Sequence, residues 1–204
     1  MLPEDEFAVD LAARFGAQVA ILYGSAARGG MQPDSDVDVV CFVAGTQRGP
    51  ATYRWRGYLI DAWIHPHADA ERPEELLKLH DGRILFDHEQ LGEALLSRIA
   101  SRVRAMPALD PRHESHLRTW AWKMLDRAAR SGPEADHRRH WLLGELPQLW
   151  CELTRRHYLG CARTLTEMQS ESPPVYLALA QALRPGASLP DVERAVLEIV
   201  GPRD

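Results

Sequence analysis

Two patterns of hydrophobic residues divide the chain. The first half contains apolar runs of strand length, whereas the second half has apolar residues three or four apart, as on one face of a helix. An acidic start after Pro3 and an apolar residue at every fourth position predict a helix that ends at Gly16. The apolar runs predict strands at residues 18–23, 36–43, 53–64 and 83–87. We expect the third of these strands to be antiparallel to its neighbour.

Helical periodicity dominates the rest of the chain. Pro147 is expected to kink or split the helix that contains it. Pro107 and Pro111 bracket a linker, so we predict two domains, at residues 1–106 and 107–204. The fold class is therefore α+β in the first domain and all-helical in the second. Helices are expected at residues 71–80, 91–103, 113–130, 136–158, 173–183 and 190–200.

The connection between the first two strands carries the candidate chemistry. Residues two apart on a strand point to the same face, so Asp36 and Asp38 present their carboxylates side by side. Such a pair implies a cation, and hard divalent ions such as Mg²⁺ take oxygen ligands and often hold substrate phosphates. Upstream, Gly24 lets the backbone approach a ligand, and its N–H and that of Ser25 can point at an anion. We expect Asp34 to be a turn residue.

These residues resemble a known signature. Gly24-Ser25, ten further residues and then Asp36-x-Asp38 resemble the motif of the nucleotidyltransferase superfamily. The form is most similar to the minimal and the antibiotic nucleotidyltransferases. A third acid on a later strand completes that motif, and Asp61 lies inside an apolar strand as the motif requires. The resemblance covers roughly residues 18–90.

The resemblance implies both a fold and a reaction. The fold is a short mixed sheet flanked by helices, followed by an all-helical lobe that binds substrate or a partner. The reaction is transfer of a nucleoside monophosphate, AMP from ATP by default, to a hydroxyl of a small molecule or protein, with release of pyrophosphate. Asp36, Asp38 and Asp61 would hold Mg²⁺ or Mn²⁺, and Asp61 would alternatively take the proton of the attacking hydroxyl. Gly24 and Ser25 would bind the terminal phosphates.

Three further residues are candidates for the same site. Arg28 either contacts a phosphate or forms a surface ion pair. Lys123 is one of only two lysines and lies on a basic helix edge that either holds a triphosphate or is simply solvated. Glu145 is a candidate base, because a helical-domain glutamate has that role in some antibiotic nucleotidyltransferases, although no local motif aligns it. The basic edge consists of His116, Lys123, Arg127 and Arg130.

Composition limits the partners. The chain has 24 Lys and Arg against 29 Asp and Glu, a net charge of −5, and a long nucleic acid would require a basic face. No apolar run is long enough to span a bilayer, and the acidic N-terminus is unlike a signal peptide. The three cysteines have no metal-like spacing. We therefore expect a cytoplasmic protein without membrane or long nucleic-acid partners.

Two other functions fit part of the pattern. The chain is alternatively an antitoxin-like protein that neutralises a partner through its helical lobe, or a nucleotide sensor with an inactive site. Retention of all three acids argues against the sensor. Incubation with labelled nucleoside triphosphates, Mg²⁺ and a cell extract distinguishes these functions from nucleotidyl transfer.

Overall fold

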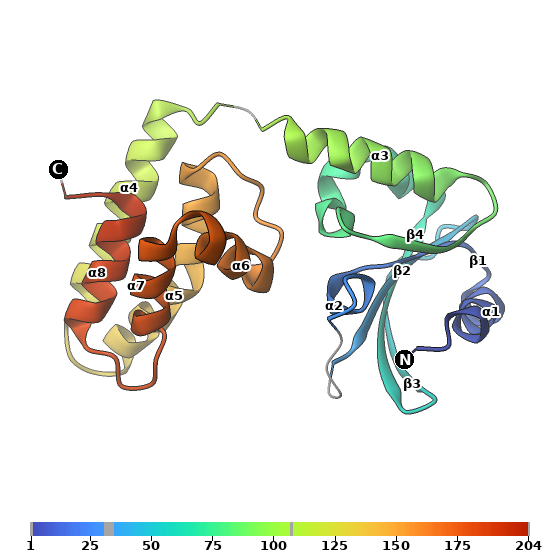
Figure 1. Ribbon diagram of the computed structural model, residues 1–204, viewed down its shortest axis with the longest axis horizontal. Helices are drawn as coiled ribbons and strands as arrows, with labels where there is room; N and C mark the ends of the chain where they lie inside the picture. The colour runs from blue at the N-terminus through green and yellow to red at the C-terminus, as the bar shows by residue number, and fades with distance from the viewer. Residues whose placement is uncertain (1, 31–34, 107, 204) are drawn as a thin grey trace. The chain divides into compact units, whose positions relative to one another are not determined.

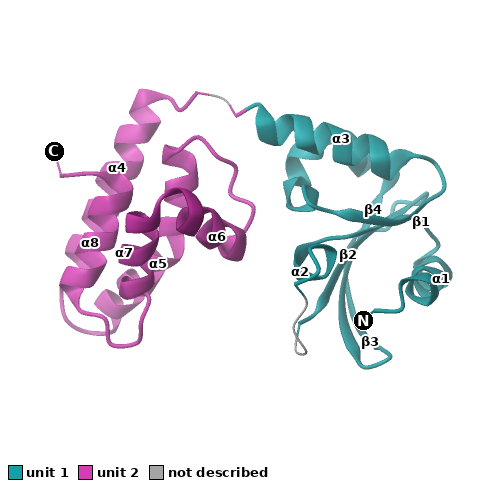
Figure 2. Cartoon of the chain, in the orientation of Figure 1, with its two compact units in different colours: residues 1–105 teal, residues 106–204 magenta. Residues whose placement is uncertain are grey.

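The computed structural model describes residues 2–30, 35–106 and 108–203. The chain forms two compact units, Met1–Ala105 and Met106–Asp204 (Figure 2), and each has its own hydrophobic core. Asp34 and Pro107, for which we predicted a turn and a linker, lie outside the described residues. No helix among the described residues is long and apolar enough to span a membrane.

The first unit is built on a five-stranded mixed sheet (Figure 1). Its strand order is β3-β4-β2-β1-β5. β2 and β4 are parallel, and the other neighbouring pairs are antiparallel. This mixed sheet, together with the helices of both units, confirms the predicted α+β class. The strands are β1 (Ala17–Leu22), β2 (Val37–Val43), β3 (Gly49–Trp55), β4 (Tyr58–Pro66) and β5 (Arg83–Asp87).

Helices cover both faces of this sheet. The unit contains α1 (Glu4–Phe15), the short α2 (Gly24–Ala27) and α3 (Leu91–Arg104). α1 ends at Gly16 as predicted, where φ is 64°. Phe7 and Leu11 of α1 pack on one face of the sheet, and α3 packs on the other through side chains including that of Ile99. β2 is therefore buried on both faces, as its sequence predicts.

The predicted strand at residues 53–64 is wrong, because the segment is a hairpin. Arg56 and Gly57 form a two-residue turn with φ values of 49° and 89°, and these positive angles match the twist of paired strands. β3 enters this turn and β4 leaves it, so the chain reverses where one long strand was expected. β4 is antiparallel to β3 but parallel to β2, which corrects the expected orientation.

The helix predicted at residues 71–80 is also wrong. Three 3₁₀ segments occupy residues 67–79, and Pro73 begins the second because it cannot donate a backbone hydrogen bond to continue the first. Ala70 of η1, Leu79 of η3 and Leu76, which follows η2, are buried in the core beneath α3. The segments are η1 (His67–Glu71), η2 (Pro73–Glu75) and η3 (Leu77–Leu79).

The described residues of the second unit form helices joined by loops, and none of them is in a strand. α5 continues through Pro147, so this proline does not split it, and it ends before Arg155, where φ is 60°. α6 was not predicted, because its buried side chains are only Thr164 and Met168, too few for a recognisable apolar period. The helices are α4 (Pro111–Ala128), α5 (Pro133–Leu153), α6 (Cys161–Glu171), α7 (Pro173–Ala182) and α8 (Leu189–Val200).

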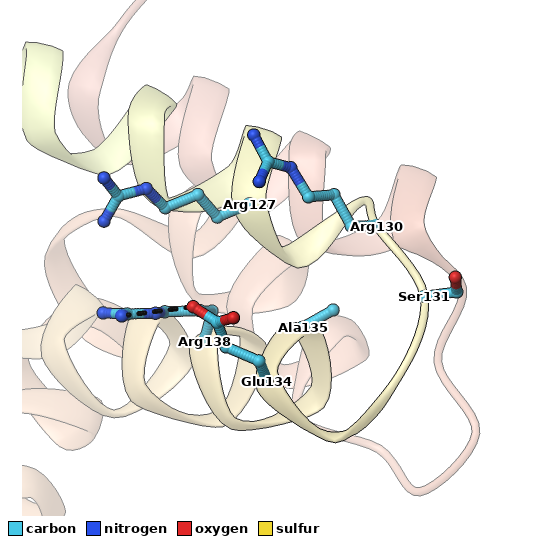
Figure 3. A pocket seen from close by; sticks show the side chains of 6 residues that line it. All are labelled: Arg127, Arg130, Ser131, Glu134, Ala135 and Arg138. Atoms are coloured by element: carbon cyan, nitrogen blue, oxygen red, sulfur yellow. Dashed lines mark hydrogen bonds and ion pairs between the residues drawn. The ribbon is translucent and has the colours of Figure 1, made fainter.

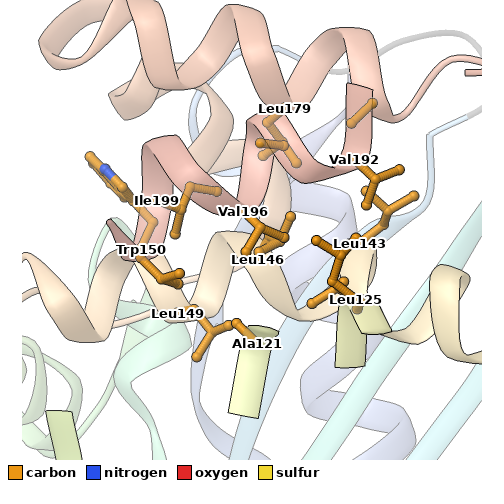
Figure 4. Close-up of a cluster of buried hydrophobic side chains, with 14 of the residues drawn as sticks. Ala121, Leu125, Leu143, Leu146, Leu149, Trp150, Leu179, Val192, Val196 and Ile199 are labelled. Atoms are coloured by element: carbon orange, nitrogen blue, oxygen red, sulfur yellow. The ribbon is translucent and has the colours of Figure 1, made fainter. Parts of the chain in front are cut away.

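A single apolar cluster holds these helices together (Figure 4). It receives Leu125 from α4, Leu146 from α5, Met168 from α6, Leu179 from α7 and Val196 from α8. These side chains are at most 5% exposed, so removing atoms from them leaves a cavity rather than exposing a surface.

Leu146→Ala should therefore lower the free energy of unfolding of the second unit by about 2–5 kcal/mol. Leu177→Ala is the matched control, since Leu177 is 65% exposed on α7 and its change should stay within about 0.5 kcal/mol. Urea unfolding followed by tryptophan fluorescence measures both. Equal destabilisation by the two substitutions would contradict the assignment of this core.

Candidate functional site

Three carboxylates meet at the edge of the first unit where β2 begins. The parallel register of β2 and β4 places Asp61 directly beside Asp38. Asp36 precedes the first residue of β2 and, two positions before Asp38, shares its face. One carboxylate oxygen from each of the three residues lies within 4.8 Å of the others. The structure thus brings together the three acids expected to bind metal, from two strands that are not consecutive in sequence.

This arrangement is electrostatically unfavourable without a cation. The pKa of Asp38 is raised to about 6, mainly by burial and in addition by the neighbouring charges of Asp36 and Asp61. All the donor atoms are hard carboxylate oxygens, which suit Mg²⁺ and Mn²⁺ better than softer transition metals. The residues therefore fit a divalent metal site, and a bound ion would relieve the repulsion that raises this pKa.

The Gly24-Ser25 turn abuts the acids. β1 leads directly into α2, and the N–H of Tyr23 donates to the carbonyl of Asp38 at 3.1 Å. Gly24 has φ of 67°, and a Cβ atom there would collide with Oδ2 of Asp38. Both the backbone angle and this contact require glycine. The carbonyl of Ser25 accepts from the N–H of Gly30 at 3.0 Å, which closes the turn after α2.

The remaining candidates lie in different places. Arg28 ends α2, and its positive charge acts to lower the pKa of Asp38, against the stronger effect of burial. Lys123 lies on α4 in the second unit and lines a cavity of about 330 Å³ with Arg118 and Arg203. Glu145, on α5, accepts a hydrogen bond from Nε1 of Trp141 at 3.2 Å. Nucleotide binding by Lys123 and base catalysis by Glu145 stay predictions.

Sequence reasoning missed Lys78, which lies beside the acids. Its Nζ donates to the hydroxyl of Tyr23 at 3.2 Å and lies 4.8 and 5.0 Å from the ring centroids of Tyr23 and Trp63. Burial lowers the pKa of Lys78, and the charges of Asp38 and Asp61 oppose that shift. Lys78 therefore supplies positive charge to the acid cluster from the last 3₁₀ segment. Its rarity was a usable signal, because it is the other of the chain's two lysines.

Thr52 is a second residue that the sequence did not reveal. It pairs with Asp61 across the β3–β4 hairpin, and its hydroxyl donates to Oδ1 of Asp61 at 3.5 Å. This contact orients the carboxylate and leaves its other oxygen available. No sequence signal marks Thr52, since its pairing depends on a hairpin within what was read as one strand.

Comparison with known proteins supports the resemblance. Residues 5–92 match a family model described as a nucleotidyltransferase domain. No curated protein matches the sequence. Among solved structures, a nucleotidyltransferase-like protein from Exiguobacterium sibiricum 255-15 is 14% identical, with 96% of this chain and 72% of that chain covered and a TM-score of 0.47.

Gly24→Ala should weaken Mn²⁺ binding at least about tenfold, because the new methyl group displaces the Asp38 carboxylate. Gly29→Ala is the matched control. Gly29 has a similar φ of 72° but nothing within 4 Å of an added Cβ, so it carries the same backbone strain without the collision. Calorimetric titration with MnCl₂ measures both variants. Equal affinities would show that Gly24 is required only for its backbone angle.

Metal affinity should also depend on pH through Asp38. A carboxylate must lose its proton to bind a metal, and the pKa of Asp38 is raised to about 6 in the metal-free protein. Affinity should therefore be constant above about pH 7 and fall about tenfold between pH 7 and pH 5, as protons compete with the ion. Mn²⁺ titrations across this range measure the effect. A flat profile down to pH 5 would exclude Asp38 as a ligand with this pKa.

Proposed function

We propose that the protein transfers AMP from ATP to a hydroxyl group, because residues 5–92 match the model of a nucleotidyltransferase domain. One observation carries the proposal. Asp36, Asp38 and Asp61 converge against Gly24, the glycine that starts the predicted phosphate-binding turn. The three acids and this turn are the parts that nucleotidyl transfer requires, because the reaction depends on positioning and on charge stabilisation.

Asp36 and Asp38 would hold the divalent ion, and Asp61 would either complete the metal site or act as the base. When bound, Mg²⁺ or Mn²⁺ would neutralise the triphosphate and stabilise the charge that develops at the α-phosphorus. Asp38 lies closest to the turn, as its contact with Gly24 shows, and so links the metal ligands to the phosphate-binding backbone. The amides of Gly24 and Ser25 are in the first turn of α2, where helix geometry leaves N–H groups without partners, and they would bind the terminal phosphates.

Asp61 is the proposed proton acceptor. Its Oδ1 accepts from Thr52, and its second oxygen would take the proton of the acceptor hydroxyl. The hydroxyl oxygen then forms a bond to the α-phosphorus of ATP. The bond from the α-phosphorus to the bridging oxygen breaks, and that oxygen leaves with pyrophosphate and the electron pair. Arg28, whose charge already reaches Asp38, would contribute a further positive charge near the phosphates.

The acceptor is proposed to be a small hydroxylated molecule or a partner protein. Incubation of the protein with labelled ATP, GTP, CTP and UTP, Mg²⁺ and a cell extract tests donor and acceptor together. Label in the small-molecule fraction would identify a small hydroxylated acceptor, and label in the protein fraction would identify a partner protein. Absence of both products and of pyrophosphate release with all four nucleotides would contradict nucleotidyl transfer.

Asp36→Asn and Asp38→Asn should each lower pyrophosphate release at least about a hundredfold and weaken Mn²⁺ binding, because each removes a charged ligand. Asp61→Asn should retain ATP–Mn²⁺ binding but lose transfer by about 10²-fold or more, since Asn has the same shape and cannot accept the proton. Calorimetry and a pyrophosphate assay measure the two effects separately.

Asp5→Asn is the matched control, because Asp5 is exposed on α1 and away from the acid cluster. Its binding and turnover should equal those of the wild type. Wild-type turnover in Asp61→Asn would remove Asp61 from the reaction. Loss of metal binding in the same variant would instead make Asp61 a necessary ligand.

A further inference from the structure

A second cluster of charge lines a cavity of about 240 Å³ on the helical unit (Figure 3). Arg127 and Arg130 lie on one side of the cavity, from α4 and the turn that follows it, and Arg138 lies on the other side, from α5. The sequence pattern placed Arg127 and Arg130 on one basic helix edge, but it did not predict that Arg138 lies opposite them. The lining residues are Arg127, Arg130, Ser131, Glu134, Ala135 and Arg138.

The positive charge of this cavity is incompletely balanced. Glu134 is its one acid and pairs with Arg138 at 3.5 Å, although the Glu134 side chain is 82% exposed. Arg127 and Arg130 form no ion pair or side-chain hydrogen bond within the part of the chain that the structure describes. Three guanidinium groups against one carboxylate leave a formal charge of +2. Arg156 of the same unit differs from these arginines, because both of its guanidinium NH₂ groups donate to Glu171.

Arg138 is held in place but retains unused donors. Its guanidinium lies 5.5 Å from the ring centroid of Trp141. Its Nε is buried and has no hydrogen-bond partner among the described residues. A guanidinium group has five N–H donors, and the long contact to Glu134 uses few of them. Oxygen atoms of a ligand could therefore accept hydrogen bonds from the N–H groups of Arg138 that no described protein group uses.

We propose that this cavity binds a phosphate group, either free or carried on a nucleoside. Arginine pairs with phosphate in a planar, two-pronged geometry, and a phosphate dianion matches the +2 charge, whereas a single carboxylate leaves one charge unmatched. The volume is below the range of about 300–1,000 Å³ that is usual for drug-sized ligands, so it suits a phosphate rather than a whole nucleotide. The proposal does not depend on nucleotidyl transfer by the first unit.

Titration of the full chain with inorganic phosphate tests the site directly. The solution contains no divalent metal, so that the carboxylates of the first unit repel the added anion. The Nε–H signals of Arg127, Arg130 and Arg138 in ¹H–¹⁵N spectra, assigned through the single Arg→Gln variants, should shift and saturate. The dissociation constant should rise at least about tenfold in the Arg127→Gln/Arg130→Gln double variant, which loses two charges.

Arg184→Gln is the matched control, because Arg184 is an exposed arginine of the same unit and does not line the cavity. Its affinity for phosphate should equal that of the wild type. Melting temperatures of all variants check that the fold is retained, and Arg130→Gln alone, at an exposed position, should weaken binding even if the double variant is destabilised.

Further titrations identify the source of the phosphate. Tighter binding of AMP than of phosphate assigns the group to a nucleotide, and equal affinity assigns it to free phosphate. Adenosine, which lacks the phosphate, should leave the three arginine signals unchanged. The proposal is overturned if the double variant binds phosphate as the wild type does, if adenosine shifts these signals as AMP does, or if no signal saturates.

Discussion

Repulsion among three carboxylates is the constraint around which the first unit is built. Backbone pairing between β2 and β4 fixes Asp38 beside Asp61, so the two residues cannot move apart without breaking the sheet. The pKa of Asp38 is raised first by burial and then by the charges of Asp36 and Asp61, so this repulsion contributes to the shift. Neighbouring groups lessen it only in part: Lys78 contributes positive charge, and Thr52 donates a hydrogen bond. A divalent ion would complete the balance.

Hydrophobic burial holds these charges in place. Val39 and Val40, which follow the acids on β2, are fully buried on opposite faces of the sheet, one in the core beneath α1 and the other in the core beneath α3. A slip of one residue in the register of β2 would exchange the faces of every side chain and carry Asp38 out of the site. The apolar sequence after the acids is therefore what keeps the carboxylates together, because it anchors β2 in the cores on both faces of the sheet.

The two units concentrate charge in different ways. In the first, the acids come from neighbouring strands and backbone hydrogen bonds set their positions. In the second, the arginines come from the end of one helix and the start of the next, and packing of Arg138 on Trp141 helps to position them. Both clusters lie where elements meet, since only there can side chains distant in sequence approach one another. Their opposite signs suit a cation in one unit and an anion in the other.

Local geometry is what the sequence by itself determined. Helix α1, the Gly24-Ser25 turn and the shared face of Asp36 and Asp38 follow from periodicities that act over a few residues. The resemblance to nucleotidyltransferases added Asp61, although its strand was assigned wrongly.

Tertiary structure decided the rest: the parallel pairing that puts Asp61 beside Asp38, the 3₁₀ segments that bring Lys78 to the acids, and the contact between Gly24 and Asp38. Such contacts join residues far apart in the chain, and periodicity does not encode which strand pairs with which, because register and partner are selected by the packing of the whole unit.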